Sequence, residues 1–274
     1  MSLDDFCSST ADECPNPPFR EWPLISCVVA TYERPKHLRR ALDSILAQTF
    51  QDMEVWVIHD GLPSEDTTEV YGEYSEKFEA AGIDFFPIWI DEHTGYYCTP
   101  RNVVTENCRG AYVANLDDDN EWLPDALASL VEAMEEGETW PDIVYGRRTY
   151  VVDEGAPEYH KDLKVADMAG DSPFVPWDAV AHVRLAGNQP NFNFIDSSDF
   201  LAAKGALYRL GLRMGHIWDD SRRRYGDFYL MSDGLLAADW RFKGIDKIVQ
   251  RYHIDGSNLQ LLRSPSEVPT EKLL

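Results

Sequence analysis

An apolar run that ends in three consecutive carboxylates constrains the fold of this chain most. Residues 111–116 read AYVANL, and Asp117, Asp118 and Asp119 follow directly. Such a run is typical of a parallel strand buried on both faces, and open α/β sheets bind ligands beyond the carboxyl ends of their strands. Packed carboxylates repel one another, which a divalent cation such as Mn²⁺ or Mg²⁺ relieves. The alternative for an isolated triplet is a solvated acidic turn.

Strand and helix patterns alternate around this run. Apolar runs at residues 24–30, 54–59, 83–90 and 142–152 predict further buried strands. Three stripes at helical spacing lie between the strands: Leu38, Ala41, Leu42, Ile45 and Leu46; Val70, Tyr71, Tyr74 and Phe78; Leu127, Leu130, Val131 and Met134. This order predicts the α/β class, with an open, mostly parallel, Rossmann-like sheet flanked by helices.

Local signals add details. Pro35 fits the first position of the first helix, and Thr99 before Pro100 predicts a capped helix start. The pattern from Trp122 to Pro124 predicts another helix start. The second half is less regular: we expect a strand at 194–203, a short glycine-closed helix at 207–211, a helix from 226 and a last strand at 245–254.

Composition excludes some classes of function. The 274 residues carry a formal charge of −23, which disfavours bulk polynucleotide or anionic membrane as a partner without excluding a local basic patch. Five irregularly spaced cysteines suit free thiols in a reducing compartment. No signal-peptide core or long apolar run is present, so we expect a soluble, cytoplasmic protein without a transmembrane segment. The oligomeric state is not readable from the sequence.

Three polar turns should meet at one edge of the sheet, at residues 31–33, 59–61 and 117–119. Tyr32 offers a ring for a base, and Asp60 can accept hydrogen bonds from a base or ribose. With the acid triplet they describe a pocket for a nucleoside diphosphate. Arg101, at a helix start, could reach the phosphates or pair with the acids.

These blocks resemble glycosyltransferase family 2. The resemblance is specific from about residue 24 to 124 and looser to 254. It is carried by residues 26–35, 42–50, 57–61, 100–102, 110–112 and 116–120, which read SCVVATYERP, LDSILAQTF, VIHDG, PRN, GAY and LDDDN.

The resemblance implies a GT-A fold, a nucleotide-sugar donor, a divalent metal and inversion at the anomeric carbon. By position, the nucleotide-binding residues would be Thr31, Tyr32, Glu33, Asp60, Arg101 and Asp118. Asp118 would reach the ribose, and Asp119 would bind the metal, helped by Asp117. His59 and Glu33 depart from the usual family residues and leave base selectivity open, with uridine favoured.

The acceptor half is assigned by the same resemblance. Asp227 is the expected general base, with a helix cap as its alternative role. Asp196 is the expected acceptor-side acid, with Asp199 a weaker rival, and His253 or Asp255 could be late metal ligands. Arg222, Arg223 and Arg224 either contact a phosphate of donor or acceptor, or pair with neighbouring acids such as Asp219 and Asp220.

The expected organisation is an acidic leader (1–22), a nucleotide-sugar-binding half (23–123), an acceptor-binding half (124–255) and a tail (256–274). The acceptor could be a glycan, a lipid-linked sugar, a protein or a modified nucleic-acid base. Two other readings compete with a transferase. One is a catalytically inactive nucleotide-sugar-binding or scaffold relative, and the other is a sugar nucleotidyltransferase, which would need a glycine-rich phosphate loop after the first strand.

Overall fold

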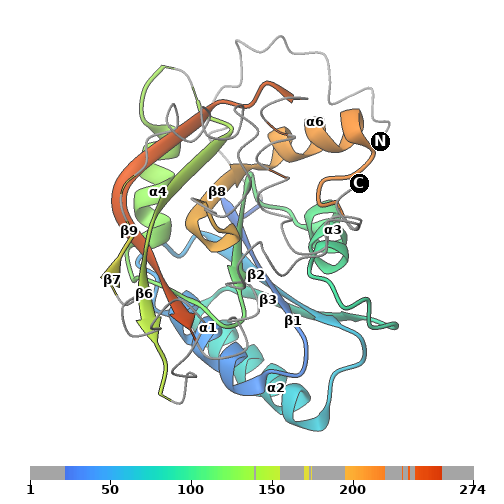
Figure 1. Ribbon diagram of the computed structural model, residues 1–274. Helices are drawn as coiled ribbons and strands as arrows, with labels where there is room; N and C mark the ends of the chain where they lie inside the picture. The colour runs from blue at the N-terminus through green and yellow to red at the C-terminus, as the bar shows by residue number, and fades with distance from the viewer. Residues whose placement is uncertain are drawn as a thin grey trace, which may run out of the picture.

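In the computed structural model, all the described strands belong to one mixed sheet (Figure 1). The structure describes residues 22–138, 140–154, 170–172, 174, 195–219, 230, 234 and 238–254. Within them, the strand order is β3-β2-β1-β4-β8-β6-β9-β5, and β7 pairs with β6. The strands are β1 (Ile25–Thr31), β2 (Met53–Asp60), β3 (Asp84–Ile90), β4 (Tyr112–Asp117), β5 (Glu121–Trp122), β6 (Ile143–Val152), β7 (Gly170–Asp171), β8 (Phe200–Ala203) and β9 (Phe242–Ile254).

The first four strands in this order form the predicted parallel part. Thr31 at the end of β1 pairs with His59 of β2, and Ala30 pairs with Asp117 of β4. Asp60 of β2 in turn pairs with Ile90 of β3. The carboxyl ends of all four strands therefore meet at one edge, as predicted from the sequence.

Helices cover both faces of this part. They are α1 (Pro35–Leu46), α2 (Glu65–Ala81), α3 (Cys98–Asn107), α4 (Ala126–Glu135) and α6 (Lys204–Met214). Cys27 and Val29 of β1 belong to the core under α1, α2 and α4, whereas Val28 belongs to the core under α3 and α6. This alternation explains why the strand is apolar throughout: both of its faces are buried.

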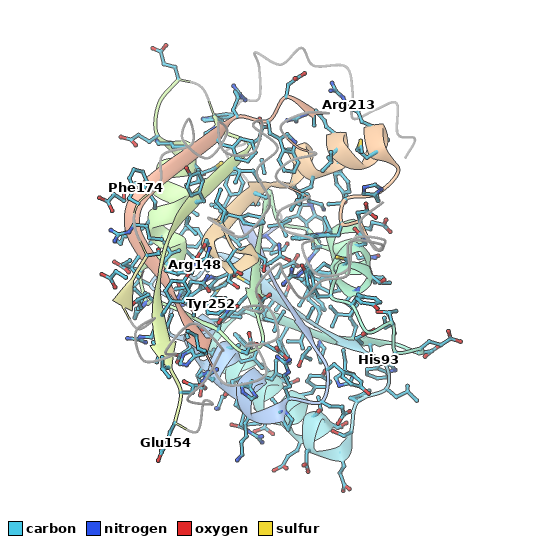
Figure 2. All side chains as sticks on the ribbon, in the orientation of Figure 1. His93, Arg148, Glu154, Phe174, Arg213 and Tyr252 are labelled. Carbon is cyan, nitrogen blue, oxygen red and sulfur yellow. The ribbon has the colours of Figure 1, made fainter. Side chains whose placement is uncertain are left out.

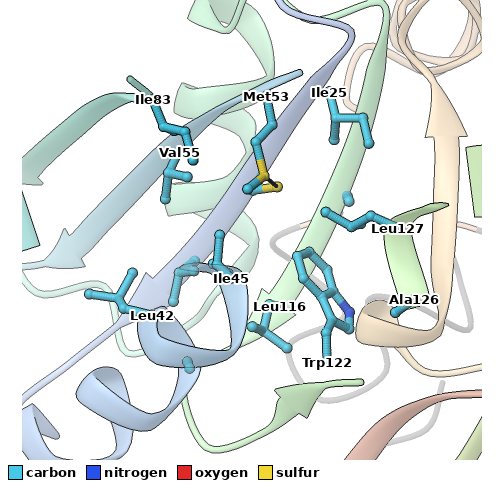
Figure 3. Close-up of a cluster of buried hydrophobic side chains, with 14 of the residues drawn as sticks. Ile25, Leu42, Ile45, Met53, Val55, Ile83, Leu116, Trp122, Ala126 and Leu127 are labelled. Carbon is cyan, nitrogen blue, oxygen red and sulfur yellow. Dashed lines mark hydrogen bonds between the residues drawn. The ribbon is translucent and has the colours of Figure 1, made fainter. Parts of the chain in front are cut away.

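Trp122 fills the core on the first of these faces. Its side chain lies among Leu116, Ala126 and Leu127 (Figure 3), and its indole nitrogen donates a 2.8 Å hydrogen bond to the carbonyl of Ser198. The Gln48 amide joins α1 to α4, because it donates to the Leu123 carbonyl at 2.8 Å and accepts from the Leu127 amide.

The second half continues the sheet with antiparallel pairs. β8 pairs antiparallel with β4 and with β6, while β6 and β9 run parallel and side by side as long ribbons (Figure 1). The strands predicted at 142–152 and 245–254 are confirmed, although β9 begins earlier, at Phe242. Within the predicted strand at 194–203, a 3₁₀ turn, η3 (Ser197–Asp199), precedes β8.

Several predicted helix ends are wrong. α1 does begin at Pro35, but α3 begins at Cys98 with Tyr97 at the cap position, so Thr99 lies inside the helix. Trp122 belongs to β5, where it pairs with Gln250, and α4 begins at Ala126. The short helix at 207–211 is the middle of α6, which ends at Met214 and is capped by Gly215 in a left-handed conformation. No helix of the described part has the length and apolar character that crossing a bilayer requires.

Candidate functional site

Two arginines hold the acidic turn after β4: Arg34 lies in the turn before α1, and Arg40 lies in α1. Thr31 donates a 2.7 Å hydrogen bond to Oδ2 of Asp118. The Arg34 guanidinium lies 3.2 Å from Oδ1 of Asp118 and 2.9 Å from Oδ2 of Asp119, and Arg40 donates to the Asp119 carbonyl. The side chain of Arg34 is 38% exposed, so this bridge between the two carboxylates faces solvent.

Asp117 has a separate, buried partner. Arg101 of α3 forms an ion pair with Oδ1 of Asp117, which also accepts a 3.0 Å hydrogen bond from Ser197. The Arg101 guanidinium packs over the rings of Tyr97 and Trp218, at 4.4 and 4.9 Å from their centroids. Of the two roles that the sequence left open for Arg101, the structure shows pairing with an acid.

The pKa values of Asp117 and Asp118 are both raised. Burial raises the pKa of Asp117 to about 6 against the opposing pull of Arg101, and Asp196 and Asp119 raise it further. Burial likewise raises the pKa of Asp118 to about 6, opposed by Arg34 and Thr31. Carboxylates under such repulsion suit a divalent cation. Among the described residues, however, no group of three or more His, Cys, Asp or Glu is placed to hold one.

His59 explains one departure from the family pattern. Its ring is fully buried, Nδ1 lies 2.9 Å from the Gly61 carbonyl, and Nε2 accepts a 3.3 Å hydrogen bond from the backbone amide of Glu33. Glu33 has a left-handed backbone, with φ of 52°. The imidazole therefore joins the turns after β1 and β2, and Glu33 is positioned by this link.

Asp60 binds the loop after β3, for which no role was predicted. Oδ1 accepts hydrogen bonds from the amide and the hydroxyl of Thr94, both at 2.9 Å, and Oδ2 accepts one from the Gly95 amide at 2.8 Å. The exposed ring of Tyr32 stacks on the ring of His93, with centroids 3.8 Å apart. The structure thus brings Tyr32 and Asp60 to one place, with His93 beside both.

In the second half of the chain, Asp196 caps η3 by accepting a 3.1 Å hydrogen bond from the Ser198 amide. Asp199 is fully buried in an ion pair with Arg148 and accepts a 2.6 Å hydrogen bond from Gln250. Burial raises the pKa of Asp199 to about 6, although Arg148 opposes the shift. Tyr252 lies beside Arg148, 5.8 Å from ring centroid to guanidinium (Figure 2).

His253 lies between two carboxylates. Nε2 is 2.7 Å from Glu121 and Nδ1 is 2.6 Å from Asp153, while Arg40 approaches Nδ1 at 3.1 Å. Burial would lower the pKa of His253, but the hydrogen bonds to Glu121 and Asp153 outweigh it and raise the pKa above 6.5. Both ring nitrogens face these acids, so the predicted role of His253 as a metal ligand needs one of these contacts to open.

Two further groups of residues concern the site: predicted residues that the structure does not describe, and residues near the site for which no role was predicted. Asp227, Asp255, Arg222, Arg223 and Arg224 lie outside the described residues. No role was predicted for Arg34, Ser197, Ser198 or Tyr252. Arg34 had a readable signal, because a cation directly after the first strand-end turn is placed to meet the acids that follow β4.

Comparisons with known proteins identify the family and the fold. The sequence model of glycosyl transferase family 2 matches residues 26–200, more than half of the chain. Glycosyltransferase GlyA of Streptococcus pneumoniae is 29% identical over 189 residues, which cover 69% of this chain. The chain spans 25% of the length of GlyA and about a fifth of two Rickettsia glycosyltransferases that it also matches.

Two solved structures share the fold. S. aureus TarS 1–349 in complex with UDP-GlcNAc superimposes with a TM-score of 0.60 at 18% identity, covering 84% of this chain and 58% of that one. The mannosyltransferase PcManGT from Pyrobaculum calidifontis, in complex with GDP-Man and Mn²⁺, superimposes with a TM-score of 0.58 at 16% identity, covering 91% and 61%. The predicted GT-A fold is confirmed.

Proposed function

The chain belongs to glycosyltransferase family 2, and we propose that it transfers a sugar from a nucleoside-diphosphate donor to an acceptor hydroxyl with inversion at the anomeric carbon. One observation supports this most: the hydrogen bond from Thr31 to Asp118 joins the end of β1 to the acidic turn after β4. Tyr32 and Asp60 lie at the same edge, so residues suited to a base, a ribose and a diphosphate are gathered there.

We propose a uridine nucleotide as the donor. The exposed Tyr32 ring offers a stacking face, and an ionised Asp60 can only accept hydrogen bonds, which suits the N3–H of uracil. Asp118 would accept from the ribose hydroxyls. The fold likeness to a protein solved with UDP-GlcNAc is consistent with this choice, and the guanosine nucleotide in the other likeness makes GDP-sugars the first comparison to test.

We propose Asp119 and Asp117 as the residues that hold a divalent cation. Their fit to a cation rests on the raised pKa of Asp117 and on the solvent-facing bridge from Arg34, which leaves Asp119 reachable once that guanidinium moves. When bound, the cation would neutralise the charge that develops on the departing diphosphate. His253 would join only if it released Glu121 or Asp153.

The chemical step needs one more group. The acceptor oxygen attacks the anomeric carbon, the bond to the diphosphate breaks, and its electron pair leaves with that group. We assign the acceptor proton to Asp227, which the family resemblance places at a helix start. Asp196 would orient the acceptor, and the Arg222, Arg223 and Arg224 cluster would contact a phosphate of donor or acceptor. The acceptor class remains a glycan, a lipid-linked sugar or another hydroxyl compound.

Calorimetry and turnover test this function together. With Mn²⁺ present, the wild type should bind UDP and slowly hydrolyse a UDP-sugar in the absence of acceptor. Asp119→Ala should lose metal-dependent binding and hydrolysis, whereas Asp227→Asn should keep donor binding and lose transfer. A wild-type protein that binds no nucleoside diphosphate with Mn²⁺ would favour the scaffold reading instead.

A further inference from the structure

The His93 ring lies where the proposed function puts the nucleotide base. His93 belongs to the loop after β3, yet its ring stacks on Tyr32 at the end of β1, 3.8 Å between centroids and 16° between planes. The loop also passes close to Gly61, where an added Cβ would lie 3.3 Å from Cβ of His93. In Figure 2, His93 lies at the lower right, away from Arg148 and Tyr252.

The same imidazole also engages Asp60. Nδ1 of His93 lies 2.9 Å from the Asp60 carbonyl oxygen and 3.0 Å from Oδ2 of its carboxylate. Both neighbours are acceptors, so Nδ1 carries the proton. A flat ring that stacks on Tyr32 and brings an N–H within 3.0 Å of the Asp60 carboxylate lies where the proposed function places a uracil base.

The imidazole of His93 also blocks access to the Asp60 carboxylate. A carboxylate accepts about four hydrogen bonds. Thr94 and Gly95 supply three hydrogen bonds, and Nδ1 of His93, which donates to the Asp60 carbonyl, lies 3.0 Å from Oδ2. A base stacked on Tyr32 could therefore reach Oδ2 only if the imidazole moved away. His93 is the donor best able to leave, because its side chain is 43% exposed whereas the others include backbone amides of the loop.

We propose that the His93 side chain occupies the base-binding place between Tyr32 and Asp60 in the free protein and is displaced when a nucleoside diphosphate binds. This inference rests on the proposed function. Thr94 and Gly95 keep Asp60 oriented while the imidazole swings out, so a side-chain rotation opens the place. Only molecules in which His93 has swung out can bind the base. The apparent affinity for nucleotide is therefore the intrinsic affinity multiplied by the fraction of such molecules.

Removing the ring tests the displacement. His93→Ala should bind UDP about fivefold more tightly than the wild type, the gain expected from abolishing one stacked aromatic contact. The gain must depend on the base, so the affinity for inorganic pyrophosphate should not change. Both ligands are titrated by calorimetry with Mg²⁺. Glu92→Ala, an exposed change in the same loop, is the matched control and should leave both affinities unchanged.

Each result has a distinct meaning. Unchanged or weaker UDP binding by His93→Ala, with a wild type that binds UDP, overturns the displacement and leaves the proposed function standing; weaker binding would make His93 part of the base platform. An equal gain for pyrophosphate also overturns it. If neither wild type nor variant binds UDP, the proposed function falls and this inference with it. Thermal unfolding verifies that the variant is folded, and His93→Ser replaces it if it is not.

Discussion

Thr31 and Asp118 are joined by a 2.7 Å hydrogen bond although 87 positions separate them in the chain. The hydroxyl stands at the last residue of β1, and the carboxylate lies in the turn just after β4. Both residues are almost completely buried. This contact fixes the acidic turn to the neighbouring strand end, so the geometry of the proposed diphosphate site depends on a strand that contributes no acid.

Removing the Thr31 hydroxyl should therefore cost stability and donor binding. Thr31→Val keeps the shape of the side chain but leaves Oδ2 of Asp118 without this donor, which should lower the free energy of unfolding by about 1–3 kcal/mol. Urea unfolding measures the change, and UDP titration should show weaker binding. Thr31→Ser restores the hydroxyl and should behave like the wild type. Equal stability of the valine and serine variants would contradict this role.

Arg101 should matter more for stability than the exposed arginines. Arg101→Gln leaves Asp117 inside the cluster without its cation, which should cost about 2–3 kcal/mol, less than for a fully buried pair because the Asp117 side chain is 31% exposed. Urea unfolding again gives the number. Arg39→Gln, which breaks the partly exposed pair with Glu73, should cost less than about 1 kcal/mol. Similar losses in both variants would show that the Arg101 pair is not special.

The parallel part of the sheet was predictable because its physics is local. β1, β2 and β4 are buried on both faces, so each reads as a continuous apolar run, and each ends in a polar turn. β9 is harder to delimit, because residues such as Lys243 and Asp246 interrupt it and its pairing with β6 contains register shifts. Its pairing depends on contacts across about 100 residues, which no window of sequence reveals.

The site was predictable as a set of strand ends, but not as a set of partners. Topology alone brings Tyr32, Asp60 and the acid triplet together. The donors to Asp60 come from Thr94 and Gly95 in a loop without periodicity, so no pattern announces them. The wrong cap at Thr99 has a similar cause: Pro100 is tolerated throughout the first turn of a helix, so it did not identify which residue comes first.

Gly110 should tolerate no side chain, because β1 passes directly beside it. An added Cβ would lie 2.5 Å from the Ser26 amide nitrogen and 2.7 Å from the Ile25 carbonyl carbon. These are backbone atoms, which cannot move away as the end of a flexible side chain can. Gly110→Ala should lower the free energy of unfolding by about 1–3 kcal/mol. The matched control is Gly72→Ala in α2, where nothing lies within 4 Å and alanine should add about 0.5–1 kcal/mol. Equal effects at the two glycines would refute the steric reason.

His253 should make stability depend on pH above neutrality. Its pKa is raised in the folded protein, with the hydrogen bonds to Glu121 and Asp153 outweighing burial, so the folded state holds this proton more tightly than the unfolded chain does. The resulting stabilisation is fully present below the unfolded value near 6.5 and is lost as pH rises through the folded pKa. Urea unfolding between pH 7 and 8, without divalent metal, avoids the carboxyls that titrate near pH 6 and should show stability falling with pH. Higher pH is avoided because burial raises the pKa of the Cys27 and Cys108 thiols, which also makes stability fall as the unfolded thiols ionise. His253→Gln should flatten that slope, and Asp153→Asn should shift the fall to lower pH. A wild type whose slope matches that of His253→Gln would rule out the imidazolium as its source.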